Sequence, residues 1–361
     1  MSQASAPLAH PTHNIVWPEP QRAAQFITWL SQVGPAHLLH TATLRLASAD
    51  ASFRRYFRID SDTGSRIIMD APPQHENCQP FVKVARLMAE AGLLAPEVLA
   101  WDEASGFMLL TDLGGETMMQ VIDAQNASAN LPLYQQAVDA LIRWQLASQP
   151  DVLPPYNEAL LRRELELFPE WYLGRHKGLA LTSDLRQTLD HAFGQIIASN
   201  LAQPSVFVHR DFMPRNLMKP QEAGGPLGVL DFQDAVYGPI TYDIASLMRD
   251  AFLSWDEAFC LDVTVRYWQQ ARKAGLPVGD DFGEFYRAVE WMGLQRHLKV
   301  AGIFARLTLR DGKPQYLADT PRFINYIRAT CGRYRELQPL LRMVEKVEGI
   351  EAVGGYAFGR V

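Results

Sequence analysis

Residues 206–218 read VFVHRDFMPRNLM, and residues 228–234 read GVLDFQD. In the first stretch an apolar run stops at His209, and Asp211 and Asn216 follow, five residues apart. In the second stretch another short apolar run ends on an acidic residue. Short apolar runs of this kind are typical of buried strands. The two stretches therefore predict a polar site at the ends of two strands.

The polar residues of these stretches are the types that phosphoryl transfer requires. The reaction needs a carboxylate that orients the attacking hydroxyl, and hard oxygen ligands for Mg²⁺. We predict that Asp211 is the catalytic residue and that Asn216 and Asp231 hold Mg²⁺. We expect His209 to give the loop structural support rather than to act as a base. Unrelated polar residues beside a turn are the alternative, but four such residues in this order favour a functional loop.

The composition sets the class of protein. The chain has 361 residues, a formal net charge of -6, 48% hydrophobic residues and 20% charged residues. This balance is typical of a globular protein with a large core, and the length suggests two lobes. No basic domain or long Lys/Arg run is present, so we expect no nucleic-acid partner. The three cysteines (Cys78, Cys260 and Cys331) are too far apart for a metal-site spacing or a disulfide framework.

The first residues, MSQASAPLAHPTHNIVWPEP, lack the basic and apolar regions of a secretory signal. No apolar run in the chain is long enough to span a bilayer. We therefore expect a cytoplasmic protein without a membrane partner, acting as a monomer or weak oligomer. Residues 1–20 are rich in Ala, Ser, Pro and His and are expected to form a flexible extension.

The region 21–113 predicts a small β-rich N-lobe. Apolar residues recur at helical spacing in two segments, and short strand-like runs are separated by turn signals at Gly64 and Ser105-Gly106. The predicted elements are a helix at 20–33, three strands within 40–73, a helix at 79–92 and two strands within 96–115.

The region 114–361 predicts a larger helical C-lobe, interrupted by one polar island at 204–243. Ser254 followed by Glu257 predicts a capping box at the start of one of its helices. Gly114-Gly115 predicts a joint between the lobes. We therefore expect an α+β bilobal fold in which the chemistry takes place where the lobes meet.

The stretches HRDFMPRN (209–216) and LDFQDA (230–235) resemble the aminoglycoside phosphotransferase/choline kinase family, over residues 40–305. These are small-molecule kinases with a protein-kinase-like fold, so the resemblance implies that fold, with ATP and Mg²⁺ as cofactors. Protein kinases carry Lys where this chain has Met213, which favours a small-molecule acceptor. In the resembled family an Asp at the position of Asp243 supports the catalytic loop. An ordinary acid at a helix N-terminus is the alternative.

A second resemblance is narrower. It rests on SADASFRRYFRI, MDAPP, HRDFMPRNLM, LDFQDAVYGPITYDIASL and GLQRHLKVAGIFARL, which lie between residues 48 and 307. Together these stretches are similar to the bacterial anomeric sugar kinases. That resemblance implies phosphorylation of N-acetylmuramate and N-acetylglucosamine at C1, in cell-wall sugar recycling.

Two other functions remain open. One is a kinase for another small acceptor, such as an aminoglycoside, choline or an amino acid. The other is a nucleotide-binding pseudokinase, because RIIMDAPP has Met69 and Asp70 where a kinase strand carries its phosphate-binding Lys. Asp70 would repel phosphate unless its side chain faces away or binds metal.

The loop over the phosphates is expected to be rich in glycine, because close backbone approach leaves no room for a Cβ. Here the loop is SADASF, residues 48–53, without a glycine. We expect its small residues to suffice and predict nucleotide contacts from Ser52, Phe53 and Arg54. A solvated strand residue is the alternative for Arg54.

The stretch MLLTDLGG predicts the segment between the lobes. The resemblance implies that backbone groups there bind adenine, which makes Thr111, Asp112 and Leu113 nucleotide-binding candidates. An ordinary strand end is the alternative.

The acceptor is expected to lie beside Asp211. Two charged residues are close to the loop in sequence, and a dense polar group interrupts a long apolar helix near residue 297. An acetamido sugar needs amide and hydroxyl partners, and a lactyl carboxylate suits Arg or Lys. A solvated helix face is the alternative. The predicted substrate-binding residues are Arg215, Asp234, Gln295, Arg296 and Lys299.

Overall fold

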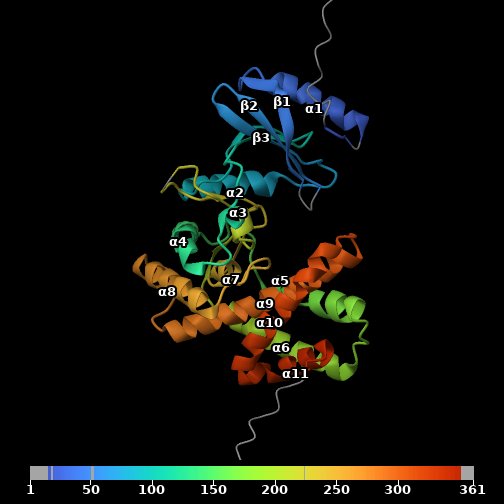
Figure 1. The fold of residues 1–361 in the computed structure, drawn as a ribbon, viewed down its shortest axis with the longest axis vertical. Coiled ribbons are helices and arrows are strands. Elements are labelled where there is room, and N and C mark those ends of the chain that lie inside the picture. Colours follow the sequence, from blue (N-terminus) through green and yellow to red (C-terminus); the bar gives the residue numbers. More distant parts are fainter. Residues whose placement is uncertain (1–14, 18, 50–52, 223, 351–361) are drawn as a thin grey trace, which may run out of the picture. The chain divides into compact units, whose positions relative to one another are not determined.

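The computed structural model describes residues 15–17, 19–49, 53–222 and 224–350 (Figure 1). The chain divides into two compact units. The N-unit comprises Met1–Thr117 and Met218–Asp234, and the C-unit comprises Met118–Leu217 and Ala235–Val361.

The segment 218–234 belongs to the N-unit, although residues 118–217, which precede it, belong to the C-unit. Its Val229 backbone N–H donates to the Leu94 carbonyl at 2.7 Å, and Phe232 packs on Phe81 with ring centroids 4.9 Å apart. Sequence order alone, which divides the chain once near residue 113, does not reveal these contacts. Strand β8 of the segment (Gly228–Val229) forms a two-stranded sheet with β7 (Leu217–Met218), whose second residue begins the segment.

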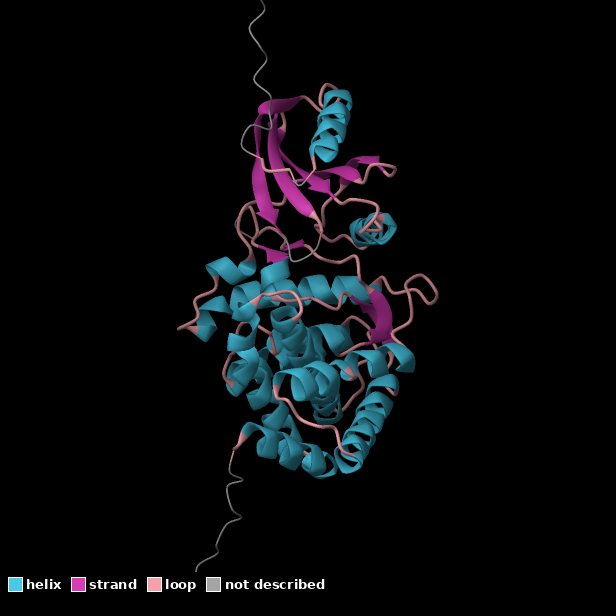
Figure 2. Ribbon diagram, turned by 90° about the vertical axis from the view of Figure 1, so that its right-hand side faces the viewer, coloured by secondary structure: helices cyan, strands magenta, loops and turns pink. Residues whose placement is uncertain are grey.

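The N-unit contains a five-stranded antiparallel sheet in the order β1-β2-β3-β5-β4 (Figure 2). Gly64 and Gly106, both at positive φ, form the two predicted turns. A Cβ on Gly106 would lie 2.0 Å from the Ala71 carbonyl oxygen, so the close backbone approach also requires glycine. The elements are β1 (Leu39–Ala49), β2 (Arg55–Ser61), β3 (Gly64–Asp70), α2 (Gln79–Glu90), β4 (Val98–Asp102) and β5 (Phe107–Thr111).

Helix α1 (Pro20–Val33) buries its apolar side on one face of this sheet. Residues two apart on a strand point to the same face, so Phe57 with Ile59 and Phe107 with Leu109 meet Phe26 of the helix. Ile15 and Trp17 lie within the predicted flexible extension, but they pack against this core. The other core residues of this face are Trp29, Leu30, Leu44 and Ile68.

The C-unit is almost wholly helical (Figure 2). Its longest helix, α9, has 28 residues and packs against several others, which explains why apolar residues occupy more than one side of it. The helices are α3 (Met118–Val121), α4 (Leu131–Leu146), α5 (Glu158–Leu165), α6 (Ser183–Leu201), α7 (Tyr242–Met248), α8 (Glu257–Lys273), α9 (Phe282–Leu309), α10 (Thr320–Arg333) and α11 (Gln338–Glu348), with a π-helical segment at Phe168–His176 and short 3₁₀ turns at Ala127–Asn130, Pro214–Asn216, Pro314–Asp319 and Arg335–Leu337.

The predicted capping box at Ser254 is wrong. Helix α8 begins two residues later than expected, and the side chain of Asp256 accepts the Phe259 backbone N–H at 2.7 Å. Ser254 instead accepts hydrogen bonds from Arg322 and Tyr326 of α10. A tertiary partner therefore replaces the local cap that the sequence suggests.

The parts of the polar island that lie in the C-unit, at 204–217 and 235–243, are carried by a two-stranded sheet of β6 (Ser205–Val208) and β9 (Val236–Pro239). Val206, Phe207 and Val208 are buried, which fixes the point at which the polar loop starts. The loop then runs through a 3₁₀ turn at Pro214–Asn216.

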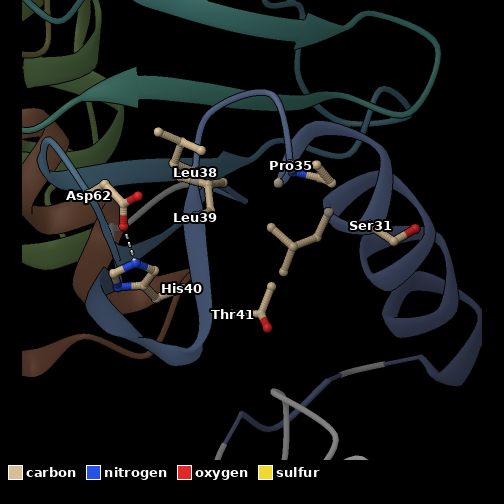
Figure 3. A pocket seen from close by; sticks show the side chains of 9 residues that line it. Ser31, Pro35, Leu38, Leu39, His40, Thr41 and Asp62 are labelled. Atoms are coloured by element: carbon tan, nitrogen blue, oxygen red, sulfur yellow. Dashed lines mark hydrogen bonds and ion pairs between the residues drawn. The ribbon is translucent and has the colours of Figure 1, made fainter.

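One hollow on the N-unit surface has a volume of about 430 Å³ and lies between the end of α1 and the start of β1 (Figure 3). Its polar content is mainly an exposed ion pair between His40 and Asp62. None of the predicted site residues lines it. Within the described part of the chain, no helix combines the length and the apolar character needed to cross a membrane.

Gly302 provides a test of the packing of α9. A Cβ there would lie 2.3 Å from the Leu167 carbonyl oxygen, so Gly302→Ala forces two backbones apart and is expected to cost about 3 kcal/mol of unfolding free energy. Gly194→Ala on α6, where a Cβ meets nothing within 4 Å, is the control and should stabilise by roughly 0.5–1 kcal/mol. Thermal unfolding followed by circular dichroism measures both, and equal midpoints for the two variants would contradict this packing.

Candidate active site

The loop after β6 has a strained backbone. Arg210 has φ 77°, in the left-handed region that long side chains rarely adopt. Such a conformation costs about 1–2 kcal/mol and persists only where neighbouring groups impose it. A strained residue directly before Asp211 marks this loop as a functional candidate.

Asp243, on the first turn of α7, holds this backbone in place. Its two carboxylate oxygens accept the backbone N–H groups of His209 at 2.7 Å and of Arg210 at 3.0 Å. Burial raises the pKa of Asp243 to about 7, against the lowering effect of these two hydrogen bonds. The next N–H, that of Asp211, donates to Nδ1 of the buried His209 ring at 3.2 Å. The structure thus brings His209 and Asp243 together under the loop.

The structure also brings Asp211 and Asn216 together. The Asn216 side-chain amide donates to the Asp211 backbone carbonyl at 2.8 Å, which closes the loop into a tight turn. Asp211 is half-buried, and its carboxylate has no hydrogen bond or ion pair with the described residues. A carboxylate held by its backbone alone can accept a proton or a hydrogen bond from a ligand.

The dense polar group of α9 is not a solvated helix face. Gln295, Arg296 and Lys299 are 0%, 4% and 8% exposed. Arg296 donates to the Arg210 carbonyl at 2.6 Å, so it holds the loop from the other side. The polar atoms of these residues contact the loop and its supports, and a part in acceptor binding stays a prediction.

Glu164 on α5 joins this group, and the sequence analysis did not identify it. Its carboxylate pairs with Arg210 and, at 3.0 Å, with Lys299, and it also accepts hydrogen bonds from Gln295 at 3.0 Å and from Tyr156. In EALLRREL it is one acid among several charged residues, and only its burial distinguishes it.

The charge of Glu164 is stabilised strongly. Burial alone would raise its pKa, but Lys299 and Arg210 outweigh burial and lower the pKa to about 2, from an ordinary value of 4.5. Because the folded-state pKa is depressed, the stabilisation is fully present above pH 4.5 and is lost as pH falls toward 2. Glu164 therefore stays ionised throughout the neutral range.

Two predicted acceptor residues are exposed. Arg215 lies in the 3₁₀ turn of the loop, and its guanidinium stands 4.5 Å from the centroid of the Phe252 ring in the C-unit. Asp234 is the last residue of the N-unit segment. Both side chains are accessible to a ligand.

Asp231 has a second strained backbone, at φ 62°. Gln233 donates to its Oδ1 at 2.8 Å, and the intervening Phe232 ring is fully buried against Phe81. The apolar anchor and the left-handed turn together fix where the Asp231 carboxylate points. The residue type and the turn suit a metal ligand.

The predicted adenine-binding segment follows β5. The Asp112 carboxylate accepts hydrogen bonds from Arg58 at 2.6 Å, Ser65 at 2.7 Å and the Gly114 backbone at 2.9 Å. Burial would raise its pKa, but these hydrogen bonds lower it. Asp112 therefore stabilises the shape of the segment. The backbone N–H and C=O of the buried Leu113 have no hydrogen-bond partner among the described residues, and buried backbone groups normally have one.

Of the predicted phosphate loop, Ser52 lies outside the described residues. Phe53 is 63% exposed and stacks on His75, with ring centroids 4.3 Å apart. Arg54 is largely buried and pairs with Glu76 at 2.9 Å. Arg54 is thus not a solvated strand residue, because its guanidinium is oriented by the partly buried acid Glu76.

Asp70, which stands where the strand Lys was expected, faces the α1 side of the sheet. It shares that face with Ile68, two residues earlier, and it is fully buried between Arg22 of α1, at 2.6 Å, and Arg55 of β2, at 2.5 Å. The opposite face holds the paired residues Met69 and Met108. Asp70 is therefore neutralised and belongs to the core that joins α1 to the sheet.

Comparison with known proteins gives a consistent result. The model of a family described as the phosphotransferase enzyme family matches residues 43–281. Among curated proteins, the chain is 51% identical to an N-acetylmuramate/N-acetylglucosamine kinase of Pseudomonas putida, over 85% of this chain and 88% of that protein. It is 46% identical to a protein of the same name from Neisseria meningitidis serogroup B, over 94% of this chain and all of that protein.

Solved structures show the fold. An ethanolamine kinase of Plasmodium vivax superposes with a TM-score of 0.59 at 11% identity, covering 92% of this chain and 93% of that one. An ADP-bound aminoglycoside phosphotransferase superposes with a TM-score of 0.55 at 14% identity, covering 82% and 96%. The predicted α+β, kinase-like bilobal fold is confirmed.

Asp70→Asn tests the structural role of Asp70. Removing the charge leaves two arginines without their buried partner, and we expect a loss of about 3 kcal/mol in unfolding free energy, with the KM for ATP within about twofold of the wild type. Asp60→Asn, which breaks an exposed pair with Arg45 in the same sheet, should cost less than about 1 kcal/mol. Calorimetry and steady-state kinetics measure the two effects. A large rise in the KM for ATP with unchanged stability would place Asp70 in the nucleotide site instead.

Proposed function

The chain belongs to the phosphotransferase enzyme family, and we propose that it is a kinase that transfers the terminal phosphoryl group of ATP to the anomeric hydroxyl of N-acetylmuramate or N-acetylglucosamine. The observation that carries the proposal is the Asp211 carboxylate, which is presented by a strained, braced loop and engaged by no other described residue. Two curated relatives, 51% and 46% identical, carry the name of this activity and support the choice of acceptor.

In the proposed reaction Asp211 hydrogen-bonds the C1 hydroxyl and takes its proton as the bond from the sugar oxygen to phosphorus forms. The bond between the terminal phosphorus and its bridging oxygen breaks, and ADP leaves. Little covalent chemistry falls to the protein, so orientation of the hydroxyl is the main contribution of the loop. His209 and Asp243 contribute by fixing the loop backbone.

Asn216 offers an amide oxygen and Asp231 offers a carboxylate. Both are hard oxygen ligands, which suit Mg²⁺. Among the described residues no cluster of three His, Cys, Asp or Glu side chains forms a metal site. A Mg²⁺ ion that also binds nucleotide phosphates and water does not require such a cluster, because one or two protein ligands suffice. The ion would neutralise charge on the transferring phosphoryl group. We propose that both residues serve as its ligands.

The nucleotide is proposed to bind the N-unit. The segment Thr111, Asp112 and Leu113 offers backbone groups for adenine, and those of Leu113 make no hydrogen bond to any residue that the structure describes. Met108 and Leu110, on the sheet face opposite α1, are apolar and suit the adenine ring. Ser52, Phe53 and Arg54 are proposed to cover the phosphates.

Arg54 is proposed to supply the positive charge that the absent strand Lys would provide. It follows the phosphate loop directly, and its pairing with Glu76 orients the guanidinium. An arginine held by an acid from the segment before α2 resembles in chemistry the Lys–Glu pair of kinases. This assignment makes the sequence around Met69 compatible with an active enzyme.

The acceptor is proposed to contact Arg215 of the C-unit and Asp234 of the N-unit segment. Arg215 is exposed on the catalytic loop itself, where a guanidinium can pair with the lactyl carboxylate of N-acetylmuramate. Asp234 can accept hydrogen bonds from sugar hydroxyls. A cationic aminoglycoside would need clustered acids instead of an arginine at this place. We expect the enzyme to act as a cytoplasmic monomer or weak oligomer.

Incubation with ATP and Mg²⁺ tests the acceptor directly. N-acetylmuramate, N-acetylglucosamine, choline and kanamycin are offered separately, and phosphorus NMR identifies the products. We expect phosphate on C1 of the two sugars and no product with the others. Asp211→Asn should lower kcat by about 10²–10⁴-fold, while Asp262→Asn, on the exposed side of α8, should leave it unchanged. Phosphate on another sugar oxygen would contradict the anomeric assignment, and absence of any product would favour a pseudokinase.

Arg54→Met tests the replacement for the strand Lys. Loss of a charge at the phosphates should raise the KM for ATP about tenfold and leave the KM for the sugar within about twofold. Arg45→Met, at an exposed position of the same sheet, is the control and should change neither. An unchanged KM for ATP in Arg54→Met would remove Arg54 from the nucleotide site.

A further inference from the structure

We propose that Glu164 is a positioning residue for phosphoryl transfer: it holds the cations Arg210 and Lys299 beneath the catalytic loop, so that neither pairs with Asp211. The inference rests on the proposed function of Asp211 and adds a requirement to it. Glu164 acts through the loop and does not contact the reacting atoms.

The contacts place Glu164 where two positive side chains meet. One oxygen, Oε1, pairs with both Arg210 and Lys299, the latter at 3.0 Å. The other oxygen, Oε2, accepts hydrogen bonds from Gln295 at 3.0 Å and from Tyr156. Both oxygens are therefore fully engaged, and the carboxylate is 6% exposed. Four contacts to one carboxylate restrict the rotamer of Glu164, whereas Oε1 of Gln295 has no hydrogen-bond partner among the described residues.

The same cations also act on Asp211. Arg210 precedes it in the chain, and both Arg210 and Lys299 interact electrostatically with its carboxylate. Arg296 does so as well, but its guanidinium is held by the Arg210 carbonyl. A buried cation without a partner is costly, so it moves to the nearest available anion. Without Glu164 both cations would be drawn toward the Asp211 carboxylate, with which they interact electrostatically and which must stay available for the sugar hydroxyl.

Each element packed around Glu164 contributes charged or titratable side chains. The loop contributes His209, the segment before α5 contributes Tyr156, α7 contributes Tyr242 and Asp243, and α9 contributes Arg296 and Lys299. Asp243 is engaged by two backbone N–H groups and Tyr242 accepts a hydrogen bond from Lys299 at 3.2 Å. Glu164 is thus the member whose carboxylate pairs with both Arg210 and Lys299.

The test is a set of substitutions measured by steady-state kinetics. Glu164→Gln keeps the size of the side chain but removes its charge, and its single amide oxygen can accept from only one of the two pairs of donors. We expect kcat to fall about 30-fold or more, with the KM values for ATP and sugar within about twofold. Glu166→Gln, two residues along the chain and paired with Arg186 at the surface, is the matched control and should leave kcat unchanged.

The double variant Glu164→Gln/Lys299→Met separates positioning from mere stability. It removes one of the two cations that Glu164→Gln releases, so kcat should recover at least about fivefold relative to Glu164→Gln alone. Additive losses, or a Glu164→Gln variant with wild-type kcat, would overturn the proposal. Should Glu164→Gln fail to fold, Glu164→Asp takes its place. The shorter acid reaches both cations less well and must lower kcat about fivefold with unchanged KM, and wild-type kcat in that variant would overturn the proposal.

Hydrolysis of ATP without any sugar is measured on the same variants, because water then takes the place of the acceptor at Asp211. If the wild type hydrolyses ATP but phosphorylates no sugar, the proposed acceptor fails, and the effect of Glu164→Gln on hydrolysis still decides this proposal.

Discussion

The structure depends above all on one carboxylate, that of Asp243. Its two oxygens accept consecutive backbone N–H groups at 2.7 and 3.0 Å and so impose a left-handed conformation on Arg210. The strain places the next residue, Asp211, at the end of a buried strand with its carboxylate unengaged by the described residues. Strand β6, helix α7 and the loop thus pack together as one substructure. This packing maintains the left-handed backbone conformation of Arg210, which an isolated chain would rarely adopt.

The buried charges around the catalytic loop balance one another. Each cation beneath the loop has a partner: Glu164 for Arg210 and Lys299, and the Arg210 carbonyl for Arg296. Buried ion pairs contribute little net stability, since desolvation offsets their attraction. Here the ion pairs fix the conformation, because they keep positive charge close to the loop without engaging the Asp211 carboxylate. The same logic applies to Asp70, whose two arginines join α1 to the sheet.

Local sequence patterns predicted much of the fold and of the catalytic loop. Spacing identified the strands and the long helices, and the order of His209, Asp211 and Asn216 identified the loop that the structure places together. What sequence could not show depends on contacts between distant segments. Glu164 lies 46 residues from Arg210 in sequence, and nothing in its neighbourhood distinguishes it from a surface acid. Asp256 caps α8 in place of Ser254 because α10 engages that serine.

We propose that Asp211 orients the anomeric hydroxyl of an N-acetylated amino sugar. A crystal structure with a non-hydrolysable ATP analogue, Mg²⁺ and N-acetylglucosamine tests it most directly, through the distance from the Asp211 carboxylate to each sugar oxygen. We expect the C1 oxygen to lie within about 2.6–3.2 Å of that carboxylate. A sugar bound with a different hydroxyl there, or an Asp211 carboxylate paired with Arg210 in the complex, would contradict it.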